Sequence, residues 1–261
     1  MKNFVVGAQL YSVRSLTQTA ESLKETLKSI KAMGYNTCQL SGQSREIPDE
    51  AVADMLAETG VRCVVTHNSM DDFEKALPEL IARHKKWNCK YAGLGGMPAD
   101  YHRDAEGFLR FANKANEIAA KLKDEGLVFV YHNHAFEFNR FDGVTGMDIL
   151  FDNFGDNVQF ELDSFWIQAG GANPVDWFRK VNGRMEVAHF KDMRGTNDFN
   201  PVNVMVPVGE GNLNWKELKK ACEETGVLYA EVEQDNASDM EKPLSQLEIS
   251  AGHLKAMGFT L

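Results

Sequence analysis

The strongest constraint in this sequence is a strict alternation of short apolar segments with longer helical ones. The short segments are rich in Val, Phe, Tyr and Cys and almost continuously apolar, as parallel strands covered on both faces should be. We expect eight strands, at Phe4–Leu10, Asn36–Leu40, Val61–Thr66, Tyr91–Leu94, Leu127–His132, Val158–Leu162, Met185–Phe190 and Val227–Val232. The expected helices are Glu21–Met33, Asp49–Thr59, Asp72–Trp87, Asp104–Glu125, Met147–Phe154, Pro174–Val181, Trp215–Thr225 and Pro243–Met257. This order predicts repeated βαβ units.

A glycine recurs where a helical segment ends, at Gly34, Gly60, Gly126, Gly183, Gly226 and Gly258. Helices commonly end on a glycine in the left-handed conformation, so the recurrence indicates one structural unit used repeatedly. The length of 261 residues also suits a TIM barrel, which typically takes ~250. We therefore predict an α/β fold, a single (β/α)8 TIM barrel over residues 1–261. A doubly wound open sheet is less suitable, because Gly7-Ala8-Gln9-Leu10 lacks the GxGxxG turn.

Composition argues against several classes of partner. The net charge is −10, whereas nucleic-acid binders need a concentrated basic surface. No segment approaches the ~20 apolar residues of a membrane span, and Met1 to Leu10 shows no secretory cleavage site. The four cysteines lie far apart without a CxxC pair. We expect a cytoplasmic protein with free thiols that binds neither nucleic acid nor membranes.

Polar residues gather where the predicted strands end, which is where TIM barrels carry their chemistry. Alternate side chains of a strand share a face, and three pairs therefore point the same way: Glu161 with Asp163, His189 with Lys191, and Glu231 with Glu233. We predict a metal site formed by Asp163, His189, Glu233 and one strand-five residue, which is His132, His134 or Glu137. Carboxylate and imidazole ligands suit one divalent ion of Mn, Co, Zn or Mg. Carboxylates brought this close would repel one another without a cation.

Plainer roles exist for the same residues, since Asp163 is also suited to cap a helix and Glu233 to be a solvated loop carboxylate. Trp166 lies three residues after Asp163, where its ring is suited to pack against a sugar. Glu210, between Gly209 and Gly211, is a poor neighbour for a phosphate and favours an unphosphorylated sugar.

A family resemblance is carried by Gly7–Arg14, Tyr131–Phe138, Phe160–Trp166, Ala188–Asp192, Val208–Gly211 and Val232–Asp235. These segments resemble the sugar phosphate isomerase/epimerase family of the xylose isomerase-like TIM-barrel superfamily, whose relatives include ketose 3-epimerases and inosose dehydratase. That family binds one divalent metal through Glu, Asp, His and Glu. Asp163, His189 and Glu233 match the last three, whereas strand five departs from the pattern and offers His132.

The resemblance implies a divalent-metal-dependent isomerase or epimerase of a small keto-sugar or polyol that acts through a cis-enediolate. It implies that Glu233 or Glu137 removes a proton and that His134 or Lys191 returns or relays it. The predicted metal ligands are then His132, Asp163, His189 and Glu233. The predicted substrate-binding residues are His67, Trp166 and Gln9.

Three other functions stay open at this point. A keto-sugar dehydratase or lyase, similar to inosose dehydratase, fits the histidines of strand five. A nuclease similar to apurinic endonucleases would need more ligands and a basic groove. A sugar-binding barrel without catalysis would need no metal. Homo-oligomerisation is not decided by the sequence.

Overall fold

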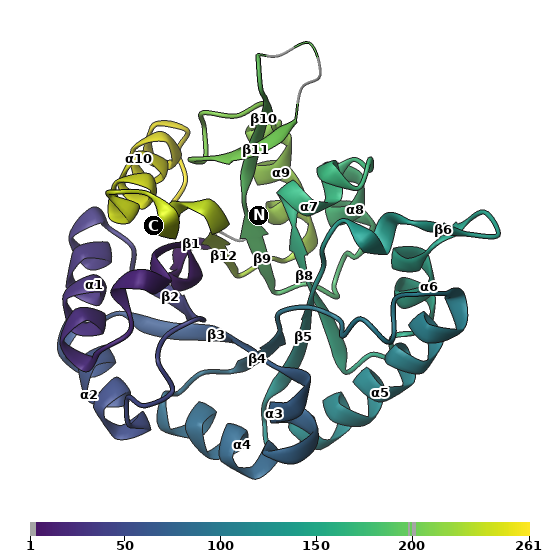
Figure 1. The fold of residues 1–261 in the computed structure, drawn as a ribbon, viewed down its shortest axis with the longest axis horizontal. Coiled ribbons are helices and arrows are strands. Elements are labelled where there is room, and N and C mark those ends of the chain that lie inside the picture. The colour runs from purple at the N-terminus through teal and green to yellow at the C-terminus, as the bar shows by residue number, and fades with distance from the viewer. Residues whose placement is uncertain (1–3, 198, 200–201) are drawn as a thin grey trace.

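The computed structural model describes residues 4–197, 199 and 202–261, and in it eight parallel strands close into a barrel (Figure 1). Their order is β1-β12-β9-β8-β5-β4-β3-β2, and β1 pairs with both β12 and β2 to close the circle. The strands are β1 (Val5–Gln9), β2 (Thr37–Leu40), β3 (Arg62–Asn68), β4 (Tyr91–Leu94), β5 (Val128–His132), β8 (Val158–Asp163), β9 (Val187–Phe190) and β12 (Tyr229–Val232). All eight predicted strands are confirmed, and so is the TIM-barrel fold.

The helices surround the barrel, as Figure 1 shows. They are α1 (Ala20–Met33), α2 (Asp49–Thr59), α3 (Met70–Lys75), α4 (Leu77–Lys86), α5 (Ala105–Asp124), α6 (Gly146–Asn153), α7 (Ser164–Ala169), α8 (Pro174–Lys180), α9 (Trp215–Thr225) and α10 (Pro243–Ala256). Short 3-10 helices lie at η1 (Leu10–Leu16), η2 (Phe136–Phe138) and η3 (Asp235–Asp239). No helix among the described residues is long and apolar enough to cross a membrane.

Two features differ from the predicted helices. The expected helix Asp72–Trp87 is divided at Ala76, where α4 begins with Pro78 in its first turn. Proline lacks the N–H that a continuous helix would need, so it starts a new helix. The short helix α7 follows β8 directly and was not predicted. All six predicted terminal glycines have positive φ, between 65° and 109°.

Two antiparallel hairpins interrupt the βα pattern and project from the barrel (Figure 1). One joins β6 (Arg140–Phe141) to β7 (Val144–Thr145), and the other joins β10 (Asp192–Gly195) to β11 (Asn203–Val206). Neither was predicted. The second hairpin follows β9 immediately and so lies beside the carboxyl ends of the strands.

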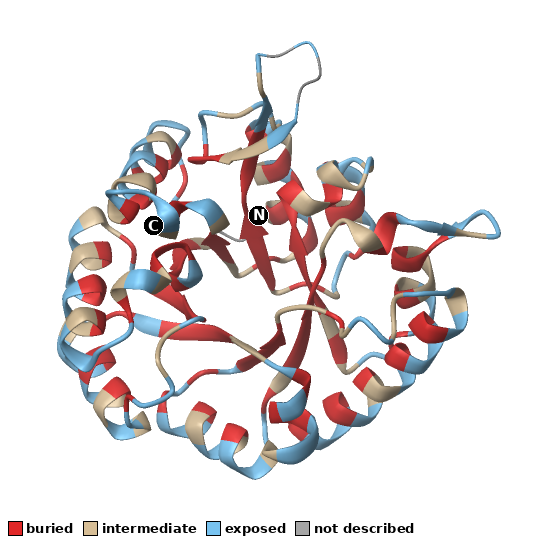
Figure 2. Cartoon of the chain, in the orientation of Figure 1, coloured by how far each residue is buried: buried red, intermediate tan, exposed pale blue. Residues whose placement is uncertain are grey.

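The barrel interior is apolar at one end and polar at the other. Val65, Tyr91, Val130 and Val187 form a small buried cluster of their own, separate from the large core between strands and helices. His132 lies two residues after Val130 on β5, and His189 lies two residues after Val187 on β9, so both histidines share the inward face of their strands. Figure 2 shows the barrel strands buried over most of their length, with the helices buried along their inner sides. The apolar end therefore supports a ring of polar side chains at the carboxyl ends.

Candidate metal centre

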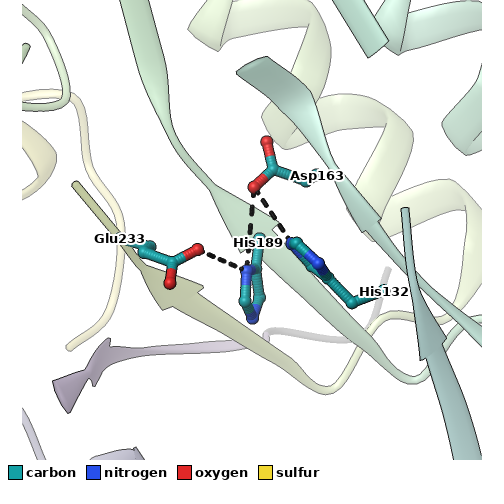
Figure 3. Close-up of side chains that lie close together, drawn as sticks. All are labelled: His132, Asp163, His189 and Glu233. Atoms are coloured by element: carbon teal, nitrogen blue, oxygen red, sulfur yellow. Dashed lines mark hydrogen bonds and ion pairs between the residues drawn. The ribbon is translucent and has the colours of Figure 1, made fainter. Parts of the chain in front are cut away.

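Four buried side chains converge at the carboxyl ends of neighbouring strands (Figure 3). His132 ends β5, Asp163 ends β8, His189 lies on β9 and Glu233 directly follows β12. One atom from each lies within 4.8 Å of the others. Asp163 Oδ2 is 3.3 Å from His132 Nε2 and 3.8 Å from His189 Nδ1, which is 3.0 Å from Glu233 Oε2. Such separations fit around a single ion with metal–ligand bonds of ~2.0–2.2 Å.

Each of the two histidines contacts an acceptor outside the cluster through the ring nitrogen that faces away from it. His132 Nδ1 lies 3.2 Å from the backbone oxygen of Gly95. His189 Nε2 lies 2.6 Å from Gln39 Oε1 and 3.2 Å from Glu161 Oε1. Because these oxygens only accept, each of these two nitrogens donates the hydrogen of its contact.

The opposite nitrogens, His132 Nε2 and His189 Nδ1, face the carboxylates of Asp163 and Glu233 inside the cluster. Burial would lower the pKa of His189, but the surrounding carboxylates raise it well above its usual value. Two imidazoles and two carboxylates in this arrangement fit a divalent metal, which would take the place of the protons between them.

Asp163 performs two tasks with its two oxygens. Oδ1 accepts a hydrogen bond from the backbone N–H of Trp166 at 3.0 Å and caps α7, whereas Oδ2 faces the cluster. The capping role expected as an alternative therefore coexists with a place in the cluster. For Glu233 the plainer expectation is wrong, since its side chain is only 4% exposed and contacts His189.

Lys191 places a buried positive charge among the carboxylates. Its Nζ lies 3.1 Å from Asp163 Oδ2, 2.8 Å from Glu233 Oε2 and 3.0 Å from Asp235 Oδ1. Burial would lower the pKa of Lys191, but the attraction of these carboxylates raises it above its usual range. Burial would raise the pKa of Asp163 and of Glu233, but Lys191 lowers both well below their usual values. At pH 7 the ammonium group of Lys191 and the carboxylates of Asp163 and Glu233 are therefore all charged.

A cavity of about 290 Å³ opens beside this cluster, and His67, His134 and Trp166 are among the predicted residues that line it. The rings of His134 and Trp166 have centroids 5.2 Å apart, and Lys191 Nζ lies 5.3 Å from the Trp166 ring. Burial, with help from His132 and Lys191, lowers the pKa of His134 to about 3. His134 is therefore a neutral imidazole at pH 7. Glu233 and Asp235 also line the cavity.

Two predicted site residues, Glu137 and Gln9, belong neither to the cluster nor to the cavity lining. Glu137 is fully buried, accepts a hydrogen bond from Tyr131 Oη at 2.6 Å, and accepts another from the backbone N–H of His134 at 2.9 Å. Since η2 turns the chain back, Glu137 meets Tyr131, which packs against the helix layer. The proton-abstracting role of Glu137 stays a prediction, and these contacts favour a structural role instead. Gln9 is buried and accepts from the backbone N–H of Tyr11 at 3.1 Å.

Sequence reasoning missed three supporting residues. Glu161 and Gln39 contact His189 from the side away from the cluster. Asp192 is fully buried, and its carboxylate accepts hydrogen bonds from the backbone N–H groups of Met193, Gly209, Gly211 and Leu213 and from Trp215 Nε1. The sequence shows that Asp192 follows Lys191. It does not show that hydrogen-bond donors to Asp192 come from the segment 209–215.

Fold and site together define a TIM barrel with a candidate metal centre at the carboxyl ends of its strands. The model of the xylose isomerase-like TIM barrel family matches residues 27–257, and the chain belongs to this family. This confirms the resemblance carried by the strand-end segments. A search of curated proteins finds no match.

Solved structures share the fold over almost the whole chain. A sugar phosphate isomerase/epimerase from Parabacteroides distasonis ATCC 8503 is 22% identical, with a TM-score of 0.82 over 99% of this chain and 100% of that one. A probable 3-DHS dehydratase, AsbF, from Bacillus anthracis is 15% identical, with a TM-score of 0.75 over 97% and 99%. The IolI protein with a bound zinc atom is 13% identical, with a TM-score of 0.72 over 97% of each chain.

Proposed function

We propose that this protein is an isomerase or epimerase of a small keto-sugar or polyol that depends on one divalent metal ion. The observation that carries the proposal is the cluster of His132, Asp163, His189 and Glu233, supplied by four strands that are neighbours in the barrel, next to a cavity. The family membership supports it, as does the zinc bound by the similar IolI protein. The ion is Mn, Co, Zn or Mg.

In this proposal the bound ion would supply Lewis-acid polarisation of a substrate carbonyl. Glu233 lies beside the cavity and accepts the proton from the carbon next to that carbonyl. His134 follows β5, which two strands separate from β12 in the barrel. As a neutral imidazole it returns or relays a proton, giving up the hydrogen of one ring nitrogen while the other nitrogen accepts one. Lys191 holds the carboxylates in place, and Trp166 offers an apolar wall to the sugar ring.

The proposal is tested by the metal content of the wild type and of His189→Ala. Elemental analysis should find about one equivalent of a divalent metal in the wild type and a loss of that metal in the variant, because the ligand set is incomplete. His253→Ala is the control, since this histidine lies on α10 with a side chain 43% exposed and away from the cluster. A metal retained in His189→Ala would move the site elsewhere, and no metal after reconstitution would contradict the proposal.

We also expect the enzyme to prefer an unphosphorylated sugar. Apart from the histidines, Lys191 is the one basic side chain among the described residues that line the cavity. Its ammonium group already contacts three carboxylates. A phosphate would find no free cation there and would meet negative charge. The kcat/KM for a ketose should exceed that for its phosphate by about tenfold or more, which corresponds to ~1.4 kcal/mol. A preference for the phosphate would contradict this substrate assignment.

A dehydratase or lyase is the second candidate. The observation in its favour is His134, an imidazole at the cavity that is suited to donate to a departing hydroxyl. The similar AsbF structure, named a probable dehydratase, agrees with it. Reaction in deuterium oxide separates the two functions. An isomerase or epimerase leaves solvent deuterium in the recovered sugar, whereas a dehydratase produces an absorbing enone.

A further inference from the structure

The side of His189 that faces away from the candidate metal cluster is enclosed by acceptors. Its Nε2 lies 2.6 Å from Gln39 Oε1 and 3.2 Å from Glu161 Oε1. Glu161 is fully buried, and its other oxygen lies 2.8 Å from Nε2 of His67. One carboxylate therefore joins two imidazoles, of which only His189 belongs to the four-residue cluster.

We propose that Glu161 is a positioning residue that fixes the proton of His189 on Nε2 and thereby aims an unprotonated Nδ1 at the metal. The inference rests on the metal site proposed above. The hydrogen bond of Nε2 goes to Gln39 Oε1, and the Glu161 oxygen lies beside it at ion-pair distance. An ionised carboxylate has no proton to donate, so its negative charge favours the hydrogen on the nitrogen that it faces. A carboxylate on the far nitrogen of a metal-binding histidine fixes both the tautomer and the ring orientation.

The position of Glu161 on β8 explains how the arrangement is built. Glu161 and Asp163 are two residues apart and share one face of the strand, while Leu162 between them points into the core. One strand therefore supplies a candidate ligand, Asp163, and the support for a second ligand, His189 on β9. In the register of the two strands, Asp163 lies opposite His189.

His67 holds Glu161 from the opposite side. Its ring lies against Gly95, where an added Cβ would come within 3.1 Å of the imidazole. The absence of a side chain at Gly95 thus permits the close approach. The carbonyl oxygen of Gly95 in turn contacts His132 Nδ1. Glu161 and the Gly95 backbone therefore support the two histidines of the cluster, but only Glu161 can be replaced by mutation without changing the backbone.

The inference is tested by Glu161→Gln, which keeps the size of the side chain but offers one amide oxygen for two imidazole N–H groups. Chelator competition with Zn²⁺ and with Mn²⁺ should show affinity about 10–100-fold weaker than in the wild type. NMR of ¹⁵N-labelled histidine should show that His189 no longer has its proton predominantly on Nε2. The tautomer is recorded with and without metal, because a merely structural residue would not change it.

Glu231→Gln is the matched control. Glu231 is also a fully buried glutamate on a barrel strand, but its hydrogen bond is to Thr37 Oγ1 and not to a residue of the cluster. The Glu231→Gln variant should have a metal affinity and a His189 tautomer close to those of the wild type. If Glu161→Gln does not fold, His67→Gln replaces it, because loss of the imidazole frees Glu161 and should weaken metal binding in the same direction.

The outcomes separate this inference from the proposed function. Wild-type metal affinity and an unchanged tautomer in folded Glu161→Gln would overturn the positioning role while leaving the metal site intact. A wild type that binds no metal but keeps the Nε2 proton in a Glu161-dependent way would overturn the metal-dependent function and support the role of Glu161 in fixing that proton.

Discussion

Replacement of Asp192 by alanine is expected to lower the free energy of unfolding by about 3–5 kcal/mol, the range for removing one partner of a buried charged network. Asp192 Oδ2 accepts from the N–H groups of Gly209 and Gly211 and from Trp215 Nε1, at 2.9, 3.1 and 2.7 Å. Oδ1 accepts from the N–H of Met193 at 2.8 Å. Alanine would leave these donors buried without an acceptor. Urea denaturation of both proteins measures the difference.

Asp192→Asn and Asp71→Ala complete this experiment. The asparagine variant keeps one acceptor oxygen but turns an amide NH₂ toward other donors, so it should lose an intermediate amount of stability. Asp71 forms an exposed i,i+4 pair with Lys75, with side chains 69% and 71% exposed, and its loss should change stability by less than ~1 kcal/mol. Equal stability of Asp192→Ala and Asp71→Ala would show that the buried carboxylate does not hold the loop.

The importance of Asp192 for the site follows from its place in the chain. It follows Lys191, whose side chain enters the cluster, while its own carboxylate ties the segment Val208–Gly211 to β10. Gly209 has a φ of 96°, and an added Cβ at Gly211 would lie 2.2 Å from Asp192 Oδ1. Both glycines are therefore required by the close approach of this loop, and the sequence motif Gly209-Glu210-Gly211 marks a structural contact.

The fold could be predicted because its signals are local. Each strand is a short apolar run, and many helix boundaries carry a glycine or a capping side chain within a few residues of the predicted position. The convergence of Asp163, His189 and Glu233 was also predictable, because period-two alternation and the shared carboxyl end of parallel strands determine where these side chains point. Once the barrel is assigned, strand alternation directs these side chains into the barrel interior at its carboxyl end.

The remaining features depend on contacts that local patterns do not encode. Glu137 follows β5 by several residues, and only the turn at η2 decides that it meets Tyr131 and not the cavity. The role of Glu161 depends on the rotamers of His189 and His67 on two other strands. The hairpins are insertions whose pairing partners lie across loops. Alternation predicts which face a side chain occupies, but not which neighbour it meets there.

The buried carboxyl group of Glu137 should make stability depend on pH. Burial raises its pKa from 4.5 to about 7, although the bonds from Tyr131 and from the His134 backbone act in the opposite direction. A raised pKa means that the folded protein binds the proton more tightly than the unfolded chain does. The stabilisation is therefore complete below about pH 4.5 and is lost as the pH rises through 7. This rise in the pKa of Glu137 corresponds to ~3 kcal/mol.

Glu137→Gln removes this titration, so the difference between wild type and variant is informative at two pH values. Between about pH 5 and pH 8 the wild type should lose about 2–3 kcal/mol more unfolding free energy than the variant does. Histidines that titrate in the same interval are present in both proteins and cancel in the comparison. Glu117→Gln on α5, where the side chain is 65% exposed, should give a curve parallel to the wild type. Parallel curves for Glu137→Gln as well would show that Glu137 is ionised throughout, because its bonds to Tyr131 and His134 would then outweigh its burial.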